Sequence, residues 1–331
     1  MTPDLCRLLD IDIPILSAPM GGAAGPDLVA AVCEAGGYGT IPLWGRPVAA
    51  VAAGIDAVRA RTGGNFAVNI RLDLPHDEAI GACIDRQVHA VSLFWGHSPA
   101  TIEAARRGGL TVMVSVGSAE EARIAAEAGA DVIVAQGWEA GGHVWGQVAT
   151  LALVPAVADA VNVPVVAAGG IADGRGMAAA LTLGASGVWI GTRFLASREA
   201  TIHPDYRARI LAAPETASEW YGDLYDGNWP DAPHRALANA TARAWREAGA
   251  AAPGQRPGEG EAIGLDPGGA AVRRYQSYTP HPETSGDIAA MSLWAGQGVG
   301  LVRDVQPAAE IVRDIHEEAR RILNAAPGLL E

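Results

Sequence analysis

Short apolar segments and longer segments with helical spacing alternate along the first two hundred residues. Eight apolar segments are rich in β-branched residues, which favour strands. They cover Ile13–Ala18, Tyr38–Ile41, Phe66–Ile70, Ala90–Phe94, Thr111–Val116, Asp131–Ala135, Pro164–Ala168 and Gly187–Ile190. The alanine-rich segments between them repeat apolar positions every three or four residues, as amphipathic helices do. These helices are predicted at Asp27–Glu34, Val48–Arg61, Pro99–Arg107, Ala119–Ala128, Leu151–Val161 and Gly174–Leu183.

This alternation predicts an α/β fold. Strands that alternate with helices pair in parallel through right-handed crossovers, and eight such units suggest a closed (β/α)8 barrel, the TIM barrel. An open doubly wound sheet is the alternative. That fold places its phosphate loop after the first strand, whereas here the strongest glycine-rich candidates follow strands seven and eight.

The alternation stops near residue 201. We expect residues 1–200 to form the barrel and residues 201–285 to form an inserted, partly irregular appendage over the barrel mouth. Residues 286–331 would supply helices that pack on the barrel, so the C-terminal appendage would be small and mostly helical. Its predicted helical segments are Arg235–Glu247, Ile288–Ala295 and Ala308–Leu323.

Composition narrows the chemistry that this fold could carry. Hydrophobic residues make up 49% and charged residues 18% of the chain, as in a folded globular protein. All 24 cationic side chains are arginine, so a Schiff-base aldolase or a pyridoxal-phosphate enzyme is excluded for want of a lysine amine. The net charge of −13 and the scattered arginines argue against binding of nucleic acid.

The remaining composition indicates a cytoplasmic protein. Cys6, Cys33 and Cys83 are odd in number and far apart, which suits reduced thiols better than disulfides or a zinc site. The histidines show no spacing typical of a metal site. The first residues lack the basic and apolar regions of a signal peptide, and we expect no membrane span. Whether identical chains associate stays open.

Two of the segments that follow strands suit a flat ligand. After the first strand, Ala18, Pro19 and Met20 precede a pair of glycines, where backbone can approach a ring closely; an ordinary glycine turn is the alternative. At the end of the third strand, the Asn69 amide could both donate to and accept from the edge of a heteroaromatic ring. An asparagine that only caps a loop is equally compatible with this position.

The segment after the sixth strand carries the candidate base. It runs from Gln136 through Glu139 and the pair Gly141-Gly142 to His143. A histidine titrates near neutrality, so it can take a proton from a weak carbon acid and later return it. A lone histidine is often structural, but one that follows a double glycine at a barrel mouth favours catalysis. We expect Glu139 to orient the loop.

Two glycine-rich loops predict a phosphate site. Gly169 and Gly170 follow the seventh strand, and Gly191 and Thr192 follow the eighth. Barrels of this type commonly hold a phosphate at these two loops, on backbone N–H groups at helix N-termini. The pair therefore indicates a ligand that carries a phosphate.

These motifs resemble the nitronate monooxygenase family, formerly called 2-nitropropane dioxygenases. The resemblance covers nearly the whole chain, and its most specific part is the string from Gln136 to His143. The matching segments are Pro14–Met20, Gln136–His143, Pro164–Arg175, Leu183–Phe194, Ser285–Ile288 and Ala295–Gly300.

The resemblance implies an FMN-dependent enzyme that oxidises alkyl nitronates, the anions of nitroalkanes, with O₂ to a carbonyl compound and nitrite. It implies that His143 is the catalytic base. It also implies a set of FMN-binding residues, namely Ala18, Pro19, Met20, Asn69, Gln136, Gly141, Gly142, Gly169, Gly170, Trp189, Ile190, Gly191 and Thr192.

Other functions remain compatible with these motifs. The family often has one residue between GlyGlyHis and the next glycine, whereas Val144 and Trp145 both stand there in this chain, which could narrow or redirect the pocket. An NAD(P)H-dependent FMN reductase, similar to quinone or enoyl-acyl-carrier-protein reductases, is the first alternative. A non-catalytic flavin-binding barrel is the second. We expect the appendage tryptophans, Trp229 and Trp294 among them, to serve mainly as packing anchors.

Overall fold

All eight predicted strands form in the computed structural model. The structure describes residues 5–329. Residues 1–4 of the expected barrel domain and residues 330–331 of the expected C-terminal part lie outside that range. The barrel strands are β1 (Ile15–Ser17), β2 (Gly39–Pro42), β3 (Phe66–Arg71), β4 (Ala90–Phe94), β5 (Thr111–Val116), β6 (Val132–Gln136), β8 (Val165–Ala168) and β9 (Gly187–Ile190). The helices that follow them are α2 (Pro26–Glu34), α3 (Val48–Arg59), α4 (Asp77–Asp85), α5 (Pro99–Arg107), α6 (Ala119–Glu127), α7 (Thr150–Ala158) and α8 (Gly174–Thr182). Of these helices, only α4 was not predicted.

The strands close into a barrel. Their order in the sheet is β1-β9-β8-β6-β5-β4-β3-β2, with parallel pairing throughout. Tyr38 completes the ring, because its N–H donates to Ile15 O and its carbonyl accepts from Ser17 N, each at 3.0 Å. The predicted (β/α)8 barrel is confirmed.

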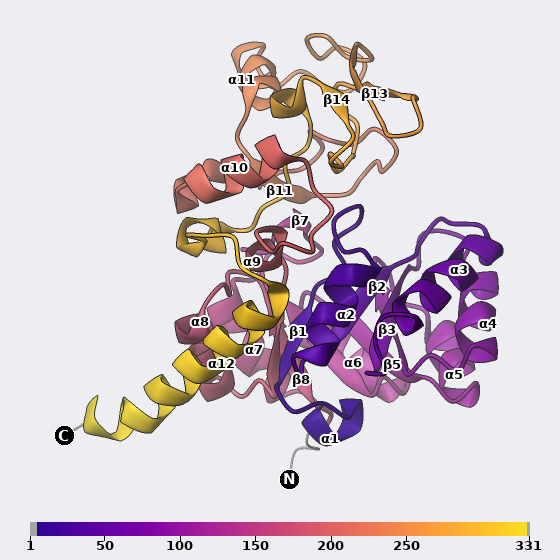
Figure 1. Cartoon of the computed structure of the whole chain (residues 1–331), viewed down its shortest axis with the longest axis vertical. Helices are drawn as coiled ribbons and strands as arrows, with labels where there is room; N and C mark the ends of the chain where they lie inside the picture. Colours follow the sequence, from indigo (N-terminus) through magenta and orange to yellow (C-terminus); the bar gives the residue numbers. More distant parts are fainter. Residues whose placement is uncertain (1–4, 330–331) are drawn as a thin grey trace.

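The barrel has apolar side chains on both faces of its sheet. Inside, Leu16, Met113 and Trp189 belong to one buried cluster, to which helix α1 (Leu5–Leu9) adds Leu5 and Leu9. Figure 1 shows α1 beneath the strands, at the end away from the appendage. A second cluster fills the layer between strands and helices. Because both faces are covered, each strand is a continuous apolar run in the sequence.

The helix in the eighth position of the outer helical layer comes from a distant part of the chain. Only the short helix α9 (Thr192–Leu195) follows β9. Helix α12 (Ala308–Ala325) instead packs along α8 and reaches α2, as Figure 1 shows in yellow. The N-terminus of α8 lies so close to α12 that a Cβ on Gly174 would come within 2.4 Å of the Glu318 Cβ. The Gly174 N–H donates to the Glu318 carboxylate at 2.7 Å.

Residues 196–307 form an appendage above the strand ends (Figure 1). Two three-stranded sheets, ordered β10-β11-β7 and β13-β12-β14, were not predicted. Their strands are β7 (Gly142–His143), β10 (Ser218–Tyr221), β11 (His234–Leu237), β12 (Ala262–Leu265), β13 (Ala271–Arg273) and β14 (Ser285–Gly286). The helices are α10 (Pro204–Ala212) and α11 (Ala240–Glu247), with 3-10 turns η1 (Glu215–Ala217), η2 (Ile288–Ala290) and η3 (Gln297–Leu301). A further 3-10 turn, η4 (Ala326–Leu329), follows α12.

Two of the predicted appendage helices are shorter than expected. The helix expected over Arg235–Glu247 begins only at Ala240, because the Asn239 side chain caps it by accepting from Ala242 N at 3.0 Å. The helix expected over Ile288–Ala295 is limited to η2. The backbone that follows η2 pairs with β11 instead, since Leu237 N donates to Leu293 O at 2.8 Å.

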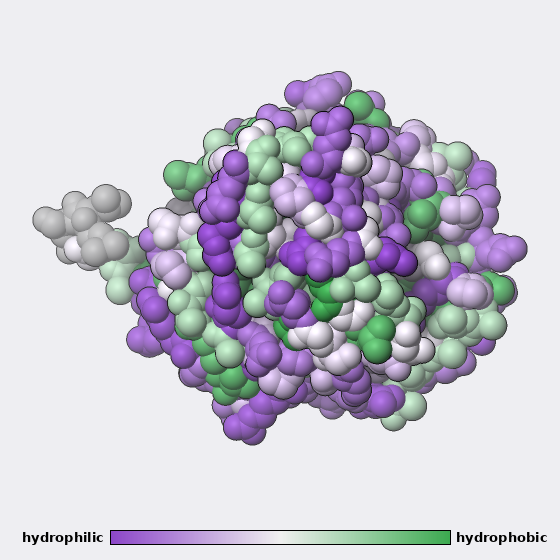
Figure 2. Space-filling model, turned by 90° about the horizontal axis from the view of Figure 1, so that it is seen from above, coloured by the Kyte–Doolittle hydropathy of each residue, from purple (hydrophilic) through white to green (hydrophobic). Residues whose placement is uncertain are grey.

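Seen from the appendage end, the surface mixes hydrophilic and apolar residues, and the strongly apolar ones are scattered (Figure 2). Across residues 5–329, no helix combines the length and the apolar character that a membrane crossing requires.

Candidate active site

A cavity of about 520 Å³ lies where the carboxyl ends of the barrel strands meet the appendage. This volume falls within the roughly 300–1,000 Å³ that is typical of cofactor and substrate sites. Thirteen of the fourteen predicted site residues line the cavity: Ala18, Pro19, Met20, Asn69, Gln136, Gly141, Gly142, His143, Gly169, Gly170, Trp189, Gly191 and Thr192. Ile190 is the exception. Its side chain is buried between strands and helices, and its carbonyl accepts from Ala18 N at 2.8 Å.

The backbone around His143 is fixed from two sides. His143 lies on the two-residue strand β7 and pairs with His234 of β11, so the barrel loop becomes part of an appendage sheet. From the other side, the Gln136 amide donates to the His143 carbonyl at 3.1 Å and accepts from Trp145 N at 2.9 Å. Gln136 thus holds the loop that carries the imidazole.

The imidazole of His143 has a defined tautomer. Its Nδ1 lies 3.3 Å from the carbonyl oxygen of Ala232, which can only accept, so Nδ1 carries the proton. Its Nε2 lies 3.3 Å from the Ser277 hydroxyl and keeps a lone pair at the cavity wall. Burial lowers the pKa of His143 well below its usual value, and the neighbouring His234 and Arg71 lower it further. At neutral pH the ring is therefore uncharged, as a general base must be.

Aromatic side chains from the appendage enclose this imidazole. The rings of His143 and Trp229 have centroids 3.7 Å apart, and that of Trp294 lies 5.3 Å from His143. Both tryptophans line the cavity, so they do more than pack the appendage. No sequence motif indicates this role, because nothing in the local pattern shows that residues 226–233 lie over the barrel mouth.

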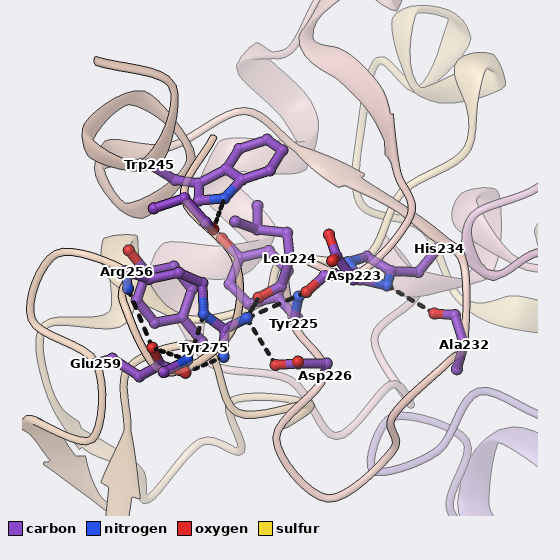
Figure 3. A network of polar contacts seen from close by, with 12 residues as sticks. Asp223, Leu224, Tyr225, Asp226, Ala232, His234, Trp245, Arg256, Glu259 and Tyr275 are labelled. Atoms are coloured by element: carbon purple, nitrogen blue, oxygen red, sulfur yellow. Dashed lines mark hydrogen bonds and ion pairs between the residues drawn. The ribbon is translucent and has the colours of Figure 1, made fainter. Parts of the chain in front are cut away.

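An ion-pair network holds the loop that carries Trp229. Arg256 donates to the carbonyl oxygens of Asp223 and Leu224, at 3.1 Å each, and to the Asp226 carboxylate at 2.7 Å. It also pairs with Glu259 and stacks on the ring of Tyr275 (Figure 3). Since the Arg256 side chain is only 5% exposed, these contacts lie largely out of water.

Two polar atoms at the cavity wall lack partners among the described residues. The Asn69 amide nitrogen donates to Ser92 at 3.0 and 3.1 Å, but its oxygen is buried and accepts nothing. The indole N–H of Trp189 is likewise buried and unpaired. Because an unpaired buried polar group costs stability, an acceptor and a donor are left here for a bound molecule.

The glycine-rich loops let three backbone segments meet at the rim. Gly169 and Gly170 adopt positive φ angles of 106° and 73°, which favour glycine. A Cβ on Gly141 would lie 2.3 Å from Gly296 N, and one on Gly298 would lie 2.9 Å from Gly170 O. The Thr192 hydroxyl accepts from Gly296 N at 3.0 Å. Segment 296–298 therefore belongs to the site.

Sequence reasoning missed both arginines that line the cavity, Arg71 and Arg46. Arg71 ends β3 and lies two residues after Asn69, so both side chains leave the strand on the same face. That spacing is a signal that could have identified it. Arg46 lies on a segment without any such motif, as do several other lining residues: Trp44, Phe94, Ser115, Asn228, Ser277, Tyr278, Thr279 and His281.

The residues between His143 and Gly146, one more than the family often has, do not shape the cavity directly. Neither Val144 nor Trp145 lines it. The Trp145 indole donates to the Glu121 carboxylate at 3.0 Å and packs edge-on against Trp95, with ring centroids 5.1 Å apart. The ring centroids of Trp95 and Trp229 are 5.2 Å apart. Trp145 therefore supports the aromatic enclosure of His143 indirectly, through Trp95.

Known proteins with this architecture share both the sequence pattern and the fold. The solved structure of FabK from Thermotoga maritima has a TM-score of 0.82 at 33% identity, covering 99% of both chains. That of nitroalkane oxidase from Streptomyces ansochromogenes has a TM-score of 0.79 at 28% identity, covering 98% of this chain and 99% of that one.

A second group of relatives matches a shorter stretch. They come from Rhodococcus jostii and Mycobacterium tuberculosis, and both are named (3aS,4S,5R,7aS)-5-hydroxy-7a-methyl-1-oxo-octahydro-1H-indene-4-carboxyl-CoA dehydrogenase. Each is 40% identical over 63% of this chain. The chain spans only 59% and 60% of the length of these two relatives.

The family itself is established by matches along nearly the whole chain. The profile of the family described as nitronate monooxygenase matches residues 2–81 and 75–318. Nitronate monooxygenase of Pseudomonas aeruginosa is 34% identical, covering 97% of this chain and 100% of that protein. The chain therefore belongs to the nitronate monooxygenase family.

Proposed function

We propose that this protein binds FMN and oxidises alkyl nitronates with O₂ to a carbonyl compound and nitrite. The observation that carries the proposal is the uncharged His143 imidazole, whose unprotonated Nε2 lies beside the Ser277 hydroxyl at the wall of a cavity rimmed by glycine loops. Membership of the nitronate monooxygenase family supports the same reaction.

The residues present fit FMN. The unpaired Asn69 oxygen can accept from the N–H edge of a flavin ring, and the unpaired Trp189 N–H can donate to an acceptor of the cofactor. Ala18, Pro19 and Met20 would contact the flat ring. The loops that carry Gly170, Gly191 and Thr192 would hold the phosphate, with Gly141, Gly142, Gly169 and Gln136 at the walls between.

Bound FMN would supply the acceptor for electrons from the nitronate. The protein's own contribution is proton transfer and positioning. His143 takes the α-proton of a neutral nitroalkane at Nε2, while Nδ1–H keeps its bond to the Ala232 carbonyl and so fixes the ring. The surrounding tryptophans help to bury the imidazole, and this burial favours its uncharged form.

A dehydrogenase or NAD(P)H-dependent reductase is the second candidate. It is favoured by the two relatives that are named dehydrogenases, although these align over only part of their length. Anaerobic mixing separates the two candidates. We expect propyl nitronate to bleach the yellow protein and NADH or NADPH to leave it oxidised; bleaching by the nicotinamide alone would assign the protein to the second class.

Replacing the base tests the catalytic role directly. In His143→Asn we expect FMN to remain bound and turnover of neutral nitroethane to fall by about 10²- to 10⁴-fold, the usual contribution of a general base. Turnover of preformed ethyl nitronate should fall much less, because that substrate has already lost its proton. His316→Asn, on the outer helix α12, is the matched control. Undiminished nitroethane turnover in His143→Asn would rule out His143 as the base.

A further inference from the structure

One cation of the cavity has no part in the function proposed above. The Arg71 side chain is only 8% exposed, and its Nε and Nη2 donate to the Asp73 carboxylate at 3.0 and 2.5 Å. Its Nη1 has no hydrogen-bond acceptor among the described residues. A buried guanidinium retains donors that suit an oxyanion, because it stays charged and presents its N–H groups in a rigid fork.

The neighbouring indole offers a second unpaired donor. The guanidinium carbon of Arg71 lies 3.1 Å from the ring centroid of Trp229, which fixes the cation on the indole by a cation–π contact. The same indole contacts the His143 ring. Its own N–H is buried and has no partner among the described residues, although Trp229 lines the cavity.

Trp229 contacts both Arg71 and His143, so the unpaired donors lie close to the candidate base. Arg71 also lies close enough for its charge to be felt at His143, where it opposes protonation of the imidazole. A negatively charged group bound beside Arg71 would satisfy the unpaired donors and would lie near the base. Buried polar groups are rarely left unpaired in proteins, so a ligand atom is the natural partner.

We propose that Arg71 and the Trp229 N–H form an oxyanion subsite that holds the nitro oxygens of the substrate. This inference rests on the proposed nitronate oxidation, whose nitronate carries its negative charge on those oxygens. The subsite would favour the nitronate over the neutral nitroalkane and would also bind nitrite, the product anion.

Binding measurements on the FMN-loaded protein test the subsite. With nitrite as the probe, Arg71→Met should raise Kd by about 10- to 100-fold, as expected for the loss of a hydrogen bond to a charged group. Trp229→Phe, which keeps a ring and removes the N–H, should raise Kd less. The Kd of neutral 1-nitropropane should change less than about twofold. Arg123→Met, at an exposed ion pair on α6, is the control and should not alter nitrite binding.

A variant that should bind nitrite more tightly separates anion binding by Arg71 from a merely structural role. Asp73→Asn removes the negative charge beside Arg71 but keeps an acceptor, so nitrite should bind more tightly. If Arg71 serves only to brace Trp229, loosening it through Asp73→Asn should weaken nitrite binding or leave it unchanged. Either of those results, or an unaltered nitrite Kd in a folded Arg71→Met variant, would overturn the subsite.

The nitrite titration needs no turnover, so its outcome is independent of the proposed reaction. If propyl nitronate fails to reduce the wild-type protein while nitrite binding depends on Arg71, the proposed function fails and the anion subsite stands. If propyl nitronate reduces the protein and the nitrite Kd does not depend on Arg71, the subsite fails and the proposed function stands.

Discussion

At the scale of single residues, close backbone contacts explain why the rim of the cavity is rich in glycine. A Cβ on Gly296 would lie 2.7 Å from the Glu139 carbonyl oxygen, and one on Gly141 would enter the backbone at Gly296. These glycines are required by the approach of neighbouring segments rather than by mobility. They let the barrel loop after β6 and segment 296–298 form one wall.

Gly141→Ala should therefore loosen that wall. The added methyl meets backbone atoms, which cannot swing aside, so we expect the free energy of unfolding to fall by about 1–3 kcal/mol. FMN affinity should fall with it. Gly63→Ala is the matched control, since its Cβ would meet nothing within 4 Å. Urea unfolding of both variants measures the difference, and equal stabilities would contradict the steric argument.

Cavity residues could be predicted from the sequence where they belong to a recognisable motif. They could not be predicted where only the folding of a distant segment brings them to the cavity. The catalytic and cofactor roles given to His143 and Asn69 remain predictions, but the structure does bring both to one cavity. Arg71 could have been found from its two-residue spacing to Asn69. Trp229 could not, because no local pattern indicates which barrel loop an appendage segment will cover.

At the scale of elements, the decisive contact joins the barrel to the appendage through β7 and β11. The start of α6 depends on a local contact, because Ser118 accepts from Glu121 N at 3.2 Å and so caps the helix. The short strands of the appendage escaped prediction, because a four-residue strand such as β11 has no clear hydrophobic period. Its partners were also unknown from sequence.

The Arg256 network should be essential for the Trp229 loop. In Arg256→Met, Asp226 and Glu259 lose their counter-charge in a largely buried site, and we expect the free energy of unfolding to fall by about 3 kcal/mol. The exposed Arg243→Met variant should change it by less than about 0.5 kcal/mol. Denaturant titration followed by tryptophan fluorescence would check both; a change in Arg256→Met no larger than in the control would show that the network contributes little.

Buried His234 on β11 should make the fold sensitive to acid. Burial lowers its pKa to about 4 from an ordinary value of 6.5. Between these values the unfolded chain binds a proton that the folded protein does not, so stability falls as the pH drops from 6.5 towards 4. The loss should be about 3 kcal/mol.

His234→Gln removes this titration while keeping a polar side chain. The variant should be less stable at pH 7.5, because His234 accepts from Tyr225 N at 3.1 Å and donates to Ala232 O at 2.9 Å. Its stability should nevertheless fall less steeply between pH 6.5 and 4 than that of the wild type. Urea unfolding at several pH values gives both slopes, and parallel slopes would exclude His234 as the source.

At the scale of the whole molecule, the alternation of strands and helices was enough to predict the barrel, because its contacts are mostly between consecutive elements. The separation into residues 1–200, 201–285 and 286–331 remains a proposal. The structure adds one detail to it: α12 occupies the helical position that follows β9. The sequence predicted this helix but not its position, since an apolar stripe on a helix does not show which element it packs against.

The position of α12 has a consequence for synthesis in the cell. Residues 196–307 are an excursion inserted between the last strand of the barrel and the helix that covers it. All eight strands leave the ribosome before residues 308–325 are made, and chains are built from the N-terminus onward. During that interval the apolar seam between α8 and α2 has no cover from Ile311, Val312 and Ile315. We therefore expect the nascent barrel to expose apolar surface, and so to be prone to aggregation, until α12 covers it.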